Sequence, residues 1–194
     1  MAGFIRRVVT GHDRNGKSVV ISDGPAPVTN RDRTPRRHRR TTDLWLTSAM
    51  PAPISAEEVD PTLEAGGFVV PMGTKLRINE FEPEPPEIRT LPLEQAIEYL
   101  KSVGNDTFVP RAGGDRQSAM HRTRTIDYAV VLEGEMTLYI GEQELLLKTG
   151  DVVIQRGTKH GWRNRSDKRV RMLYVLIDAR FEPELARLFE SEAH

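Results

Sequence analysis

The stretch 120–164 constrains the fold more than any other part of the chain, because it reads as short strands joined by tight glycine turns. The apolar run 128–132, rich in β-branched residues, is followed by Glu133 and then by the turn at Gly134. The further expected strands are 135–140, 144–148, 152–155, 160–164 and 169–177, with turns at Gly141, Gly150 and Gly157. Many short strands at this spacing are typical of a sandwich or barrel. A βαβ sheet would need helices between the strands, and this stretch has none. We therefore predict an all-β fold with minor helices.

Polar residues recur at every second position in the first part of this stretch. His121, Thr123, Thr125 and Asp127 have the same parity, so one extended strand would point all four side chains the same way. His160 follows later, three residues after Gly157, and Trp162 and Asn164 share its parity. A histidine and a carboxylate on one strand face can build a metal site or an acid/base site.

These residues also carry a family resemblance. The stretch resembles the cupin barrel, whose motifs are G-x5-H-x-H-x(3,4)-E-x6-G and G-x5-P-x-G-x2-H-x3-N. In the first motif His121 and Thr123 take the two histidine positions, Asp127 the glutamate position and Gly134 the last glycine. In the second motif Gly150, Gly157, His160 and Asn164 match, Gln155 replaces proline, and the first gap is one residue shorter. The resemblance covers about the last third of the chain well, and it implies an antiparallel double-stranded β-helix, or jelly-roll.

The resemblance also implies a site. His121, Asp127 and His160 would form a set of two histidines and one carboxylate, which suits Fe(II) and also Mn, Ni or Zn. The family normally adds a further histidine where this chain has Thr123, and Asp127 is one methylene shorter than glutamate. A divalent metal and an empty site therefore both stay open. Without a metal, His121 would act as a general base beside Asp127. Thr123, Gln155 and Trp162 are the candidate substrate-pocket residues.

Two functions follow from this site. The first is a small-molecule enzyme, metal-dependent and of oxygenase, lyase or isomerase type, acting inside the barrel. The alternative is a non-catalytic cupin that binds a small ligand with a reduced, metal-free site. The substrate and the reaction are not predictable from the sequence, because pocket shape depends on side chains from many strands.

Composition limits the classes of partner. Lys plus Arg and Asp plus Glu are both 28, so no global field favours nucleic acid or membrane surfaces. The 194 residues contain no cysteine, which excludes disulfides and thiolate sites. The N-terminal apolar run is too short for a signal peptide, and no stretch approaches the roughly 18 apolar residues of a membrane helix. We expect a cytoplasmic protein whose partner is a small molecule.

The flanks are expected to decorate one cupin domain that spans 1–194. We divide it into N-terminal strands and an arginine-rich loop (1–50), the barrel (66–177) and a C-terminal helix (182–191). Strands 4–10 and 18–22 flank the hairpin signal Asn15-Gly16. Further strands are expected at 43–47, 67–71 and 75–81, and an amphipathic helix at 93–103. The polar loop 25–42 holds Arg31, Arg33, Arg36, Arg37, Arg39 and Arg40. We expect a homodimer, because the hairpin and the terminal helix need apolar cover.

Overall fold

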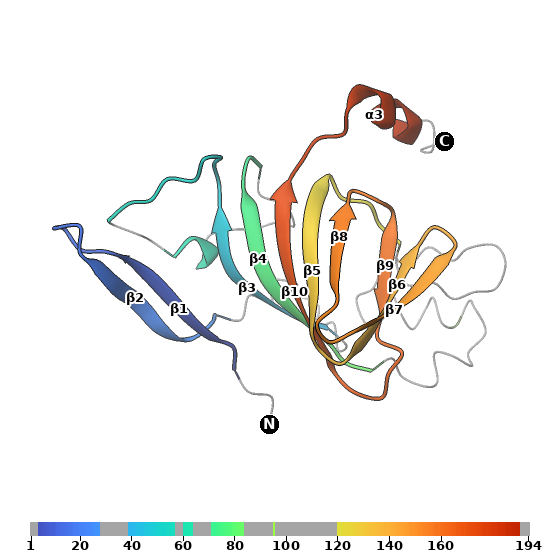
Figure 1. Ribbon diagram of the computed structural model, residues 1–194, viewed down its shortest axis with the longest axis horizontal. Coiled ribbons are helices and arrows are strands. Elements are labelled where there is room, and N and C mark those ends of the chain that lie inside the picture. Colours follow the sequence, from blue (N-terminus) through green and yellow to red (C-terminus); the bar gives the residue numbers. More distant parts are fainter. Residues whose placement is uncertain are drawn as a thin grey trace.

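Two antiparallel sheets pack face to face around an apolar core in the computed structural model (Figure 1). The structure describes residues 4–27, 39–56, 60–63, 71–83, 95 and 120–190. The five-stranded sheet has the order β3 (Arg39–Thr47), β4 (Thr74–Phe81), β10 (Val170–Asp178), β5 (Thr125–Glu133) and β8 (Val152–Arg156). The three-stranded sheet has the order β7 (Gln143–Lys148), β6 (Glu135–Ile140) and β9 (His160–Arg163). This arrangement confirms the predicted all-β jelly-roll.

The core follows the two-residue period of the strands. In β5, Thr125, Asp127, Ala129 and Val131 are buried, whereas Tyr128 on the other face is exposed. β10 buries every second residue in the same way. The core cluster consists of Ala129, Val131, Met136, Val170, Met172, Tyr174 and Leu176. Since its members come from β5, β6 and β10, it joins the two sheets.

Most predicted strands are confirmed within two residues of their expected ends. The first strand of the stretch 120–164 is an exception. The prediction that one strand carries residues 121 to 127 is wrong, because β5 begins at Thr125. His121 instead forms an isolated antiparallel bridge with His160, the first residue of β9. The chain therefore leaves the three-stranded sheet after His121 and enters the five-stranded sheet at Thr125. Because the chain changes its partner strand between these residues, the alternation of side chains in β5 does not extend back to His121.

The predicted N-terminal hairpin is present as β1 (Arg6–His12) and β2 (Ser18–Pro25), and it stands beside β3 (Figure 1). Gly16 in its turn has a φ of 77°, which favours glycine over residues with a Cβ. Arg7 fastens the hairpin to the rest of the molecule. Its guanidinium donates to the Leu44 carbonyl at 3.0 Å and forms an ion pair with Asp60, just before the short 3₁₀ helix η1 (Pro61–Leu63).

The expected loop 25–42 needs a correction at both ends. Pro25 closes β2, and Arg39 and Arg40 already belong to β3, where they pair with Phe81 and Glu80 of β4. Backbone pairing with β4 thus extends the strand into a stretch whose charge had indicated a loop. Residues 28–38, the expected strand 67–71 except Pro71, and the expected helix 93–103 except Gln95 lie outside the described residues.

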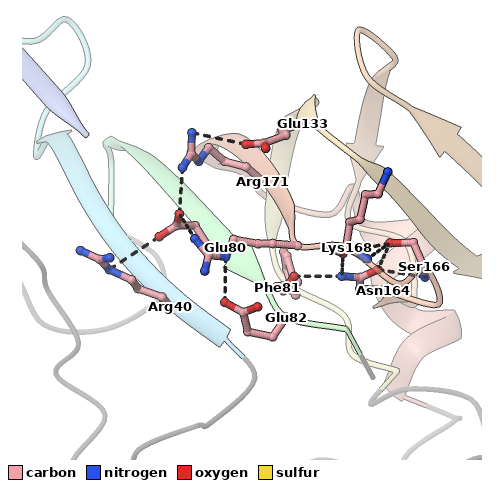
Figure 2. A network of polar contacts seen from close by, with 10 residues as sticks. Arg40, Glu80, Phe81, Glu82, Glu133, Asn164, Ser166, Lys168 and Arg171 are labelled. Carbon is pink, nitrogen blue, oxygen red and sulfur yellow. Dashed lines mark hydrogen bonds and ion pairs between the residues drawn. The ribbon is translucent and has the colours of Figure 1, made fainter. Parts of the chain in front are cut away.

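A network of ion pairs around a buried glutamate ties four strands together on the outer side of the five-stranded sheet (Figure 2). Glu80 is 4 % exposed and lies 3.0 Å from Arg171, 3.6 Å from Arg40 and 3.7 Å from Arg169. Glu82 pairs with Arg169 and Glu133 pairs with Arg171. These six side chains carry three charges of each sign, so the buried carboxylate is compensated.

The predicted C-terminal helix is confirmed as α3 (Pro183–Glu190). Its Phe189 ring lies 4.9 Å from that of Phe181, and the Arg122 guanidinium sits 3.5 Å from the Phe189 ring centre. The helix is thereby held against the segment that carries His121. Within the described part of the chain, no helix is long and apolar enough to cross a membrane.

Candidate functional site

Two histidines from distant parts of the chain meet where the two sheets exchange strands. The backbones of His121 and His160 exchange two hydrogen bonds of 2.9 Å, each N–H donating to the other carbonyl. Their ring centroids lie 4.4 Å apart, with the planes tilted by 50°. His160 is buried and His121 is half-buried. The structure therefore brings together two of the three predicted ligands.

The tautomer of His160 follows from its neighbour. Its Nδ1 lies 2.9 Å from the Thr158 carbonyl oxygen, which can only accept a hydrogen bond, so Nδ1 carries the proton. The lone pair is then on Nε2. Burial lowers the pKa of His160 to about 4, and the nearby His121 adds to this effect against the opposing Thr158 contact. His160 is therefore neutral at pH 7, the state in which imidazole binds metals or accepts hydrogen bonds.

The turn before His160 depends on Gly157. Its φ is 62°, and a Cβ at this position would lie 2.6 Å from the Phe181 ring and 3.3 Å from the Thr123 carbonyl oxygen. Only glycine fits both the conformation and the space. The close approach brings the turn that leads to Thr158 and His160 against the segment between His121 and β5.

Asp127 lies on β5 and faces the interior between the sheets. It is 4 % exposed, and its neighbours in register are Gln155 on β8 and Leu176 on β10. Burial raises the pKa of its carboxyl group, while a hydrogen bond from Thr125 and the charge of Arg77 oppose that rise. The Thr125 hydroxyl lies 2.8 Å from that of Thr123, so Thr123 supports the group that positions Asp127.

Gln155 is the partner of Asp127 across the strands and is 2 % exposed. Its Nε2 donates to the Thr158 carbonyl at 2.8 Å and also contacts the Thr158 hydroxyl. The same carbonyl accepts from His160, so Thr158 links the two side chains. Gln155 Oε1 and Asp127 Oδ1 are buried, and neither accepts a hydrogen bond from any described residue. An unmet buried acceptor costs about 1–3 kcal/mol, so such atoms call for an explanation.

Trp162 lies deeper in the same region. Its ring is edge-on to His160 at 5.9 Å and to Tyr174 at 5.8 Å, and it packs against the core cluster. Trp162 thus takes part in the core packing and also lies beside His160, where the sequence predicted a substrate-pocket residue. In the sequence, Trp162 has the same parity as His160, and this indicated that the two side chains lie near each other.

The donor set as described does not complete a three-ligand metal site. In the part of the chain that the structure describes, no group of three His, Cys, Asp and Glu side chains is placed to hold a metal ion. The two imidazoles fit such a site, since they are adjacent and His160 is neutral. Asp127 does not join them, because β5 pairs it with Gln155 and the Thr125 hydroxyl takes part of its carboxylate.

Charged residues of β4 and β3 line the same interior and were not predicted as site residues. Lys75 is fully buried and lies opposite Leu176, and Arg77 lies opposite Tyr174. Asp43 of β3 accepts from Arg77 Nε at 2.8 Å and lies 4.0 Å from Lys75 Nζ. The alternation in 75–81 separates these residues from Leu76 and Ile78. It does not reveal which face is the interior, because Ile78 and Glu80 are buried too.

A separate cavity of about 660 Å³ lies between the hairpin and β3, away from the histidine pair. Its walls include Arg7, His12, Trp45 and Leu76. Trp45 therefore faces the contact between the hairpin and the sheet.

Comparisons with known proteins agree with this architecture. Residues 108–176 match the family model described as Cupin domain. A phomopsin biosynthesis cluster protein C' of Diaporthe leptostromiformis is 51 % identical over 72 residues, which is 36 % of this chain and 37 % of that protein. The cupin-domain-containing oxidoreductase srdB of Neurospora crassa is 47 % identical over 64 residues, 32 % of this chain and 33 % of that protein. The matched stretch thus spans about a third of these relatives.

Among solved structures, a putative ethanolamine utilization protein of Salmonella typhimurium aligns with a TM-score of 0.42 and 13 % identity. The alignment covers 92 % of this chain and 100 % of that one.

Proposed function

We propose that this chain, which belongs to the cupin superfamily through the domain at residues 108–176, is a small-molecule enzyme whose reactive centre is the pair His121 and His160. The observation that carries the proposal is the convergence of the two imidazoles at 4.4 Å from separate segments. Relatives called oxidoreductases and biosynthesis cluster proteins support a redox reaction on a biosynthetic intermediate. Of the oxygenase, lyase and isomerase types, these names favour the oxygenase type.

The properties of His160 decide between two uses of the pair. A general base works best when its pKa lies near the working pH, and the pKa of His160 is about 4. A neutral imidazole with a free Nε2 lone pair is instead suited to bind a divalent ion such as Fe, Mn, Ni or Zn. We therefore assign His160 the role of ligand or acceptor, and His121 the role of base where no metal takes part.

A metal-dependent enzyme would need a third ligand, a position that the family resemblance assigns to Asp127. The pairing of Asp127 with Gln155 and Thr125 argues for the second candidate, a binder with a reduced site that holds a small molecule without turning it over. The two candidates differ in whether the protein takes up one equivalent of metal.

Metal titration separates them. Protein stripped with a chelator is titrated with Mn²⁺, Ni²⁺, Zn²⁺ and, without oxygen, Fe²⁺, and heat and metal content are measured. For the enzyme we expect one equivalent bound, and loss of binding in His160→Ala with the fold intact by circular dichroism. Thr123→His should tighten binding at least tenfold, because it supplies the ligand that the family normally has. The exposed hairpin variant His12→Ala is the matched control and should bind like wild type.

Two outcomes would contradict the metal-dependent enzyme. If wild type takes up no metal and Thr123→His gains nothing, the metal-dependent enzyme is wrong and the metal-free binder is the better description. If His12→Ala loses metal as well, the binding seen belongs to surface histidines rather than to the pair.

A further inference from the structure

The interior carries two buried oxygen acceptors on neighbouring strands that receive no hydrogen bond within the described part of the chain. Asp127 Oδ1 and Gln155 Oε1 belong to residues that are 4 % and 2 % exposed and lie directly opposite each other on β5 and β8. No described residue donates to either atom. A single buried acceptor without a donor can be accidental. Two such acceptors on the same face of neighbouring strands point to a common cause.

The orientation of both groups is fixed by their other contacts. Gln155 must place its NH2 group toward Thr158, because the Thr158 carbonyl at 2.8 Å can only accept. Its oxygen therefore points away from Thr158 and cannot be exchanged for the nitrogen. Asp127 is held by the Thr125 hydroxyl, which is itself supported by Thr123. The two free oxygens are thus held by neighbouring side chains on both sides of the pair.

We propose that Asp127 and Gln155 together bind a substrate group with two N–H donors, either a primary amide or an amidinium. A planar NH2 group directs its two N–H bonds about 120° apart and spans acceptors about 5 Å apart. Side chains directly opposite on antiparallel strands start from Cβ atoms about 5 Å apart, so one such group can reach both side chains. The proposal rests on the proposed function in one respect, that the substrate enters the interior between the sheets.

This assignment also explains the place of Asp127 in the site. Asp127 then acts on the substrate as an acceptor, and the His121 and His160 pair acts on the reacting part of the same molecule. Thr158 sets the distance between Gln155 and His160, because its carbonyl accepts hydrogen bonds from both side chains. Thr123 and Thr125 are positioning residues for the carboxylate.

The test uses small probes whose only relevant difference is their donors. Acetamide offers two N–H donors, acetamidinium offers more and adds a positive charge, and N,N-dimethylacetamide offers none. Each is titrated into the wild-type protein, and the amide resonances of β5 and β8 are followed by NMR. We expect acetamide or acetamidinium to shift these resonances with saturation, and dimethylacetamide to leave them unchanged. Preference between the two binding probes tells the neutral amide from the cation.

A variant gives an independent readout. In Asp127→Asn the new side-chain NH2 can donate to Gln155 Oε1, so the protein supplies the donor that it lacks. We expect the melting temperature to rise by about 2 °C or more, and probe binding to weaken at least tenfold. A carboxylate with a merely structural role would give a lower melting temperature. The exposed variant Glu135→Gln on β6 is the matched control and should change neither value.

The outcomes separate this proposal from the proposed function. If no probe binds, or if dimethylacetamide binds as well as acetamide, the acceptor pair is not a donor site and the proposal is wrong. A lower melting temperature or unchanged binding in Asp127→Asn also overturns it. The wild-type comparison needs no variant, so a variant that fails to fold does not leave the question open. Metal uptake through His121 and His160 is measured apart from the probes, so either idea can fail while the other holds.

Discussion

At the scale of single residues, Asn164 does more for the fold than its exposed surroundings indicate. Its Nδ2 donates to the carbonyls of Phe81 at 2.9 Å and Lys168 at 2.7 Å, and its Oδ1 accepts from the backbone N–H and the hydroxyl of Ser166 (Figure 2). The side chain is buried with all four hydrogen bonds made. Asn164, which matches the last position of the second cupin motif, therefore holds the turn between β9 and β10 together.

This network predicts a large effect of removing it. Asn164→Ala should lower the free energy of unfolding by about 3 kcal/mol, because two carbonyls and one backbone N–H lose their partners inside the protein. Urea unfolding followed by tryptophan fluorescence measures the change. Ser166→Ala, which removes only one hydroxyl from the same turn, is the control and should cost about 1 kcal/mol. Equal effects of the two variants would show that Asn164 is not the centre of the network.

At the scale of elements, the hairpin β1–β2 is joined to the remaining structure largely through one ion pair. The hydrogen bond from Arg7 lowers the pKa of Asp60 to about 2, with Thr62 adding to the effect and burial opposing it. A depressed carboxyl pKa means that the contribution to stability is complete above about pH 4. It is lost as the pH falls from about 4 to about 2, where the folded state also takes up the proton.

We therefore predict that Asp60→Asn lowers the free energy of unfolding by about 1 kcal/mol at pH 7 and has a much smaller effect at pH 2, where the carboxyl group is partly protonated in the folded state. Asp23→Asn, in the exposed pair with Arg6 within the hairpin, is the control for a general change of charge. The measurement is chemical unfolding at both pH values, together with protease cleavage of the hairpin at pH 7. A difference between wild type and Asp60→Asn that is as large at pH 2 as at pH 7 would contradict the role of the carboxylate charge.

The elements also show which parts of the fold a sequence can predict. The strands from β6 to β10, the hairpin and α3 have local signatures, namely alternation, glycine turns and a helical apolar face, and they were predicted nearly to their ends. The start of β5 was not, because the exchange of sheets between His121 and Thr125 depends on the distant partner His160. The Asp127–Gln155 pair was not predicted for the same reason, since it too depends on a distant partner strand. Only the register of β5 with β8 places Gln155, rather than a histidine, beside the carboxylate.

At the scale of the whole molecule, the outer face of the five-stranded sheet leaves apolar side chains exposed near its β8 edge. Tyr128 is 44 % exposed, Val152 58 % and Ile154 55 %. The register puts Tyr128 beside Ile154 and Val130 beside Val152, so these side chains form one continuous patch. In α3, Phe189 packs against Phe181 and Arg122, but Leu185 and Leu188 are 43 % and 63 % exposed. The terminal helix therefore still needs apolar cover, and this patch adds a second reason to expect a homodimer.

We predict that two copies pack this patch against its own equivalent around a two-fold axis, because a self-complementary apolar face is the usual basis of a closed dimer. Light scattering at micromolar concentration should give twice the chain mass of 21.9 kDa for the wild type. Ile154→Arg should give the single chain mass, since the charge would be desolvated at the centre of the interface. Ile54→Arg places the same charge at an apolar side chain that is 82 % exposed and outside the sheet, and it should remain a dimer. A wild-type mass of one chain would reject the dimer, and a dimeric Ile154→Arg would place its interface on another surface.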